Sequence, residues 1–159
     1  MKIKHYSVFF LLIVLACHAE KKAELNQSAS MTNRDQLPED PLIQKVICSS
    51  INTRKNTMST LYGNDTAFQY AFDHNGGNYP EGSVLYQITW LQKDDPRWFG
   101  GKIPGTIRSV EIVRFERNEE HKVMPVYQLY QGLPLKGVNV TETNYPIKSI
   151  TSQRMSVIP

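Results

Sequence analysis

The stretch Ser83–Leu91, which reads SVLYQITWL, decides the fold class of this 159-residue chain. Its large apolar side chains stand at every second position, and this period is typical of a β-strand that buries one face. Leucines at two of the intervening positions indicate partial cover on the other face as well. The alternating apolar residues are Val84, Tyr86, Ile88 and Trp90.

Strand patterns recur on both sides of this stretch. Met58–Tyr62 also alternates, and Gly63-Asn64-Asp65 then predicts a turn and a helix cap. Thr66–His74 predicts a short aromatic helix that ends at a glycine pair, whereas Pro41–Ile47 fits either a short helix capped by Asp40 or a strand. Further strands are expected at Ser109–Glu116, Val123–Tyr130 and Ile150–Val157. Strands dominate, so we expect an α+β fold with one or two helices packed on an antiparallel sheet.

The segment Asp94–Gly105 interrupts this pattern because it is rich in proline and glycine. It contains the consecutive aromatic residues Trp98 and Phe99. We expect an ordered loop that these two rings hold against the body of the domain.

The N-terminus has the pattern of an export signal. Lys2 and Lys4 precede an apolar run, Val8–Leu15, that is too short to span a bilayer as a permanent helix. Val14–Cys17 resembles a lipobox, so we predict a signal peptide at 1–16 and a lipid on Cys17. Ordinary signal cleavage after Ala16 or Ala19 is the alternative, and both interpretations export the chain.

Composition divides the exported part in two. Residues 17–40 hold almost no bulky apolar side chains, so a lipidated flexible tether is expected there. Residues 41–159 are expected to form one domain. The protein is therefore predicted to be anchored to a membrane and to face the periplasm or the cell surface, with no preference between the inner and the outer membrane.

Charge and cysteine content exclude several classes of function. Loss of Lys2 and Lys4 with the signal peptide lowers the formal net charge from +3 to +1, which gives no electrostatic basis for binding nucleic acid. Cys48 lies in an apolar run and is expected to be a buried, inert thiol rather than a nucleophile.

Motifs for catalysis or metal binding are absent from the sequence. There is no phosphate-binding loop, no nucleophile elbow and no His-Glu-x-x-His helix. His74 and His121 are far apart in sequence, so no metal site is expected. Asp94-Asp95 could act as an acid–base pair, but a turn is favoured because aspartate is common in turns.

Four stretches in a fixed order and spacing resemble the cytochrome P-460 family. These are Asn56–Ala67 (NTMSTLYGNDTA), Tyr79–Trp90 (YPEGSVLYQITW), Asp95–Gly105 (DPRWFGGKIPG) and Ser109-Val110-Glu111. The later two are similar to a branch of exported lipoproteins in that family that lacks the haem motif. The resemblance covers about 46–115 and implies an antiparallel sheet with packed helices.

The resemblance also implies a cofactor for which this chain lacks the attachment residues. Founding members carry a covalent c-type haem that oxidises hydroxylamine or binds nitric oxide. The Cys-x-x-Cys-His attachment motif belongs near the C-terminus, and 133–159 contains neither Cys nor His. Gln87 stands where the resemblance places the lysine that is cross-linked to the haem edge, and an amide cannot form that link.

We therefore expect an exported, lipid-anchored protein that is not a hydroxylamine oxidase and that binds a small ligand or has a structural role in the envelope. Tyr86, Gln87, Trp98 and Phe99 are the candidate pocket residues. The first alternative is a noncovalent haem protein that handles redox chemistry or nitrogen oxides, with His74 or His121 as axial ligand and Phe72 as a further wall residue. The second is a hydrolase without cofactor, which would need a cleft with clustered titratable groups.

Overall fold

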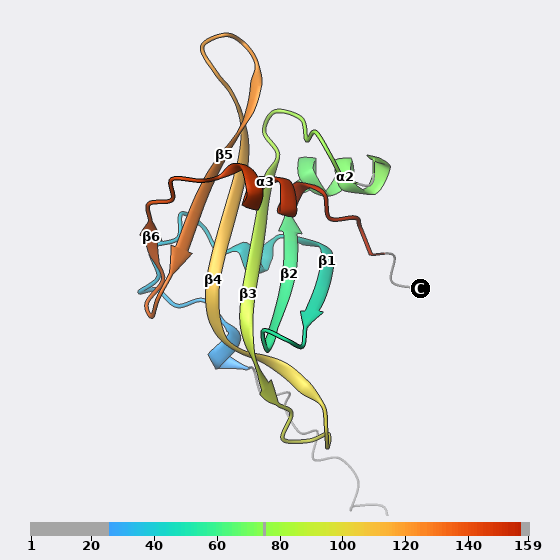
Figure 1. The fold of residues 1–159 in the computed structure, drawn as a ribbon, viewed down its shortest axis with the longest axis vertical. Helices are drawn as coiled ribbons and strands as arrows, with labels where there is room; N and C mark the ends of the chain where they lie inside the picture. Colours follow the sequence, from blue (N-terminus) through green and yellow to red (C-terminus); the bar gives the residue numbers. More distant parts are fainter. Residues whose placement is uncertain (1–25, 75, 157–159) are drawn as a thin grey trace, which may run out of the picture.

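The strands of the sheet lie in space in the same order as in the chain (Figure 1). The computed structural model describes residues 26–74 and 76–156. In these residues six strands form one antiparallel sheet with the order β1-β2-β3-β4-β5-β6. The strands are β1 (Lys45–Asn52), β2 (Thr57–Gly63), β3 (Val84–Asp94), β4 (Lys102–Arg117), β5 (Val123–Gln131) and β6 (Lys136–Val138), and the helices are α2 (Asp65–His74), α3 (Asn144–Thr151) and the 3-10 turns η2 (Gln27–Ala29) and η3 (Pro41–Ile43).

The predicted α+β class with an antiparallel sheet and two helices is confirmed. Pro41–Ile47, for which the sequence fits either a short helix or a strand, contains one of each. Asp40 caps the 3-10 turn η3 by accepting a hydrogen bond from Leu42 N (2.9 Å), and the strand β1 begins at Lys45. The expected strand at Ile150–Val157 is wrong, because Ile150 lies in helix α3. Ile147 and Ile150 are three residues apart and therefore share the helix face that packs on the sheet.

Helices α2 and α3 cover one face of the sheet, and α3 crosses in front of the strands in Figure 1. The core of this face joins residues from both helices with residues from four strands. An irregularity in the pairing of β1 and β2 between Val46 and Cys48 lets two consecutive residues, Ile47 and Cys48, both be buried. The buried residues of this core are Ile47, Cys48, Leu61, Ala67, Ala71, Tyr79, Leu85, Val113, Phe115 and Ile150.

The start of α2 is fixed by Asn64, as the turn and cap pattern predicts. Its Oδ1 accepts hydrogen bonds from Ala67 N (3.0 Å) and Val84 N (3.1 Å), while its amide group donates to Gly82 O (2.8 Å). The preceding Gly63 leaves the space that α2 occupies, since a Cβ atom there would lie 3.0 Å from Ala67 Cβ. The helix therefore packs directly on the ends of β1 and β2.

Residues 26–40, which we call the N-terminal segment, lie on the opposite face of the sheet. In Figure 1 this segment runs behind the strands. Ala29, Met31 and Leu37 pack against a second core that is centred on β3 and β4. The predicted flexible tether therefore does not describe 26–40, and the folded unit includes residues from Asn26 onward. The buried residues of the second core are Tyr86, Ile88, Trp90, Ile107, Val110, Ile112 and Leu135.

The predicted loop Asp94–Gly105 is shorter than expected, because β3 and β4 extend as a hairpin beyond the rest of the sheet (Figure 1). Only residues 95–101, which we call the hairpin tip, connect the two strands. Trp98 is 73% exposed and Phe99 is fully exposed. The expectation that these rings hold the loop against the body of the domain is wrong.

Candidate functional site

Polar groups along its length attach the N-terminal segment to the rest of the domain. Trp90 Nε1 donates to Ala29 O (3.0 Å), and Leu135 N donates to Asp35 Oδ1 (2.7 Å). Near its end, the carboxylate of Glu39 contacts the sheet. These contacts hold the segment against the second core, and a cleft lies beside the segment.

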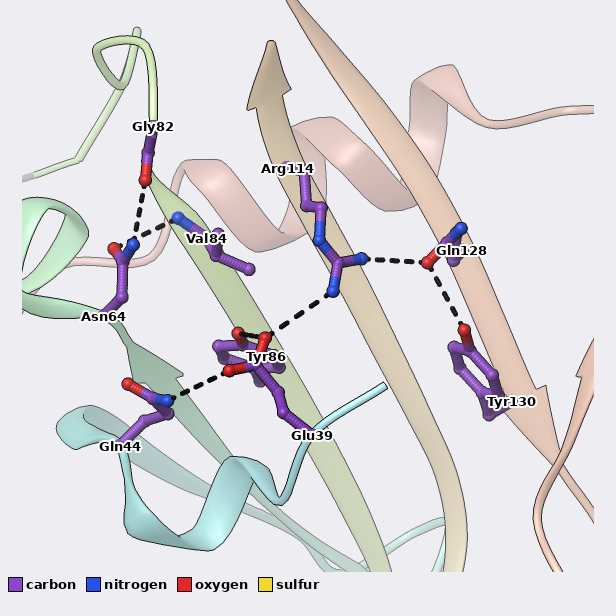
Figure 2. Close-up of polar contacts among 9 residues, drawn as sticks. All are labelled: Glu39, Gln44, Asn64, Gly82, Val84, Tyr86, Arg114, Gln128 and Tyr130. Atoms are coloured by element: carbon purple, nitrogen blue, oxygen red, sulfur yellow. Dashed lines mark hydrogen bonds and ion pairs between the residues drawn. The ribbon is translucent and has the colours of Figure 1, made fainter. Parts of the chain in front are cut away.

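Figure 2 shows the polar network around Glu39. The Tyr86 hydroxyl donates to Glu39 Oε1, and Arg114 Nη2 lies 3.6 Å from the same oxygen. Arg114 Nη1 in turn donates to Gln128 Oε1 on β5 (2.9 Å), and Gln44 donates to Glu39 Oε2 (3.4 Å). Val84 pairs with Arg114 and Tyr86 with Ile112, so Tyr86 and Arg114 point to the same face from neighbouring strands.

This network is suited to fastening the segment rather than to acid–base chemistry. Burial raises the pKa of Tyr86 well above its ordinary value, and the hydrogen bond to the Glu39 carboxylate raises this pKa further. The phenol therefore keeps its proton at neutral pH and acts as a hydrogen-bond donor.

A cleft of about 620 Å³ lies between the N-terminal segment, β4 and residues 133–135. This volume is within the usual range of small-molecule sites. Its lining includes the exposed residue Arg34 and the apolar side chains of Ile107 and Leu135. Its lining residues are Gln27, Ser28, Ser30, Thr32, Asn33, Arg34, Asp35, Thr106, Ile107, Leu133, Pro134 and Leu135. Amide, hydroxyl and guanidinium groups beside apolar carbons can bind a small polar molecule.

Asp35 shapes the wall of this cleft. Its Oδ2 accepts from Thr32 N (2.7 Å) and Thr32 Oγ1 (2.9 Å), while its other oxygen accepts from Leu135 N. Burial alone would raise the pKa of Asp35, but the hydrogen bonds from Leu135 and Thr32 lower it, and the resulting pKa lies below its ordinary value. Asp35 is therefore ionised at neutral pH and orders the loop that carries Arg34.

Gln87 lies on the other face of the sheet, in a hydrogen-bonded chain with the C-terminal residues. Gln153 Nε2 donates to Gln87 Oε1 (2.7 Å), and the Cys48 thiol donates to Gln153 Oε1 (3.2 Å). Gln87 is only 9% exposed. Burial raises the pKa of Cys48, so it remains a thiol at neutral pH, and the prediction that Cys48 is buried is confirmed.

The residues around Gln87 do not fit a haem edge at that position. The Gln87 amide oxygen is already bonded to Gln153, and the helix α3 that precedes Gln153 packs on the same face through Ile150. A ring placed against Gln87 would have to displace Gln153, which also accepts the bond from Cys48.

The four candidate pocket residues do not meet in one site. Tyr86 and Gln87 are consecutive in β3, so their side chains point to opposite faces of the sheet. Trp98 and Phe99 lie at the hairpin tip, beyond both cores. Cys17, the predicted lipidation position, lies outside the described residues.

The two candidate haem ligands lie at the ends of other elements. His74 is the last residue of α2, where its ring stacks on Tyr70 with the centroids 4.3 Å apart and its Nδ1 lies 3.2 Å from Tyr70 O. His121 is exposed in the turn between β4 and β5, with a positive φ of 59°. Within 26–74 and 76–156, no group of three or more His, Cys, Asp or Glu side chains is placed to hold a metal ion.

Sequence reasoning missed the residues that build the cleft, and of the Glu39 network it named only Tyr86. Arg34, Asp35 and Glu39 all belong to the stretch predicted to be a tether. The available signal was the pair of apolar residues Met31 and Leu37, which both pack on the second core. Their isolation among polar residues made that signal weak.

Comparison with known proteins adds no assignment. No protein-family model matches the chain, and a search of curated proteins finds no similar sequence. The described helices include none long and apolar enough to cross a membrane.

Proposed function

We propose that this chain is an exported, lipid-anchored protein of the cell envelope with a cytochrome P-460-like domain that carries no covalent haem. Its role is to bind a small polar molecule in the cleft under the N-terminal segment, and it does not oxidise hydroxylamine. The lipid on Cys17 and the P-460 likeness come from the sequence patterns, whereas the location of the binding site comes from the cleft and its polar wall.

One observation carries the haem-free part of the proposal. Gln87, which the resemblance places at the haem edge, is buried and bonded to Gln153. Gln153 thus occupies space beside position 87, where the resemblance places the cross-linking lysine. The cleft on the opposite face offers about 620 Å³ for a ligand, and its donors suit a polar molecule better than a porphyrin.

Titration of the purified full chain with haemin tests this proposal. We expect no absorbance band at one equivalent of haem per chain. The variant Gln87→Lys should likewise yield no haem that resists acid extraction, because the sequence has no Cys-x-x-Cys-His motif to hold the ring beside the new amine.

The variant Gln153→Ala is the matched control, since it opens the position beside Gln87 without adding an amine. A stoichiometric haem band in the unaltered chain would support the noncovalent haem alternative and contradict the proposal. Haem that remains with Gln87→Lys after extraction would show that the missing attachment motif is not needed.

A further inference from the structure

The hairpin tip is a well-formed loop. Asp95 N donates to Gly101 O (2.9 Å), Gly101 N donates to Trp98 O (2.9 Å), and Arg97 N donates to the side chain of Asp95 (2.8 Å). Gly100 has a φ of 76°, which a glycine adopts without strain. The loop is therefore held by its own hydrogen bonds and does not need its aromatic rings for packing.

The same loop presents its two largest apolar side chains to solvent. Trp98 is 73% exposed and Phe99 is fully exposed, and they are adjacent in the chain. Because water contact with apolar surface is unfavourable, a contiguous exposed apolar patch usually marks a binding surface. An ordered loop that carries such a patch at the end of an extended hairpin is placed to contact something outside the domain (Figure 1).

The N-terminal segment begins at the base of this hairpin. Asn26 Nδ2 donates to Pro104 O (2.6 Å), and Lys93 Nζ donates to Asn26 Oδ1 (2.9 Å). Lys93 and Pro104 lie within two residues of the last pair of the hairpin, Asp94 and Lys102. The first described residue of the chain is therefore close to the hairpin tip.

This position limits how far the tip can be from the predicted lipid. Nine residue steps separate Cys17 from Asn26, and a fully extended chain of that length spans about 30 Å at most. A lipid on Cys17 would thus keep Asn26 within about 30 Å of the membrane, and the hairpin tip close to Asn26 is within reach of the bilayer.

The basic side chains around the tip suit an anionic membrane surface. Three basic and two acidic side chains lie in the range Lys93–Lys102; Lys102 pairs with Asp94 and Arg97 lies 3.7 Å from Asp95, which leaves an excess of one positive charge. Lys93 and Arg97 line a second cleft of about 550 Å³ between the hairpin and Asn26. Exposed tryptophan and phenylalanine rings bind at the boundary between lipid headgroups and acyl chains. Basic groups beside them can bind the anionic phosphates of the headgroups.

We propose that the hairpin tip docks on the membrane that holds the lipid anchor, with Trp98 and Phe99 inserted at the interface and Lys93 and Arg97 facing anionic headgroups. This inference rests on the proposed lipid anchor and extends it. The domain then has two contacts with the bilayer, one through the lipid and one through the tip, and these fix its orientation.

Tryptophan fluorescence of the lipidated full chain in vesicles tests the docking. The chain has two tryptophans, and Trp90 is buried, so the difference between the unaltered chain and Trp98→Phe isolates the emission of Trp98. In vesicles of phosphatidylethanolamine and phosphatidylglycerol, we expect the Trp98 emission to shift to shorter wavelength and to be quenched by brominated acyl chains. Unchanged Trp98 emission in the anchored protein would overturn the docking and leave the anchor standing.

A second measurement does not depend on the lipid. Cys17→Ala should bind the same vesicles weakly and reversibly, and Trp98→Ser in that background should lower the partition coefficient about tenfold, the factor expected for one large apolar side chain. Phe72→Ser is the matched control, because Phe72 is also exposed but lies on α2, toward the other end of the molecule (Figure 1). Equal losses in the two variants, or none with Trp98→Ser, would contradict a role of the tip.

Discussion

Asp35 illustrates how one carboxylate can order a stretch that composition assigns to a tether. It accepts three hydrogen bonds, two from Thr32 and one from the distant Leu135. Its lowered pKa means that the folded state favours the ionised form, so the contact stabilises the fold above the ordinary aspartate pKa of about 4. This contribution is lost as the pH falls through the still lower pKa of the folded state.

Replacing Asp35 tests this account. We expect Asp35→Ala to lower the free energy of unfolding by about 1 kcal/mol at pH 7, because two backbone amides lose their acceptor. The difference from the unaltered chain should shrink below pH ~4, where the carboxyl becomes protonated in the unfolded state. Denaturant unfolding at pH 7 and pH 3 measures both values. Glu119→Ala, in the exposed turn between β4 and β5, is the control, and an equal loss at both pH values would contradict the role of the charge.

Individual residues also show where sequence reasoning reaches its limit. The burial of Cys48 was predictable from its apolar neighbours, but the pairing irregularity between Val46 and Cys48 that puts Ile47 and Cys48 in the same core was not. The position of Trp98 and Phe99 did not follow from their type. Aromatic side chains usually pack inside, and only the extension of the hairpin beyond the sheet leaves these two without neighbours.

At the scale of elements, strands with one buried face were predictable and short or edge elements were not. β3 has Tyr86, Ile88 and Trp90 on one face, so its period is visible in the sequence. β6 has only three residues, all exposed, and carries no such pattern. Helix α3 was not predicted, and the strand expected at Ile150–Val157 overlaps only its last two residues, because the few apolar residues there are too short a run to separate the two periods.

The packing of α3 leads to a prediction. Ile150 is 2% exposed in the first core, whereas Tyr145 on the same helix is 79% exposed. Ile150→Ala should lower the free energy of unfolding by about 2–4 kcal/mol, since it removes a buried side chain and leaves a cavity. Tyr145→Ala should change it by less than about 0.5 kcal/mol. Thermal or denaturant unfolding of the two variants measures the contrast, and similar values would show that α3 does not pack as described.

At the scale of the whole molecule, the two faces of the sheet are covered by different kinds of structure. Two helices close one face, and the N-terminal segment covers the other and leaves the cleft beside it. The α+β class was predictable because the strands dominate the sequence. The cleft was not, since its residues Arg34 and Asp35 lie about a hundred positions before Leu135 and only the folded chain brings them together.

The lipid anchor is tested on the whole protein in cells. We expect Cys17→Ala to move most of the protein from the membrane fraction to the soluble fraction of the envelope, because a hairpin tip alone binds a bilayer weakly and reversibly. Separation of the fractions by ultracentrifugation and detection of the protein in each measures the shift. Cys48→Ala is the matched control, and sedimentation of Cys17→Ala with membranes to the same extent as the unaltered protein would contradict the anchor.

The bond between Asp35 and Leu135, 100 residues apart, sets an order of events during synthesis. The N-terminal segment leaves the ribosome early, but the surface that receives it is complete only after β5 has been made. Loop closure over that length must therefore precede docking. Until then Trp90 and its neighbours are uncovered, so a nascent chain halted before Leu135 would be a substrate for proteases and chaperones that the finished protein escapes.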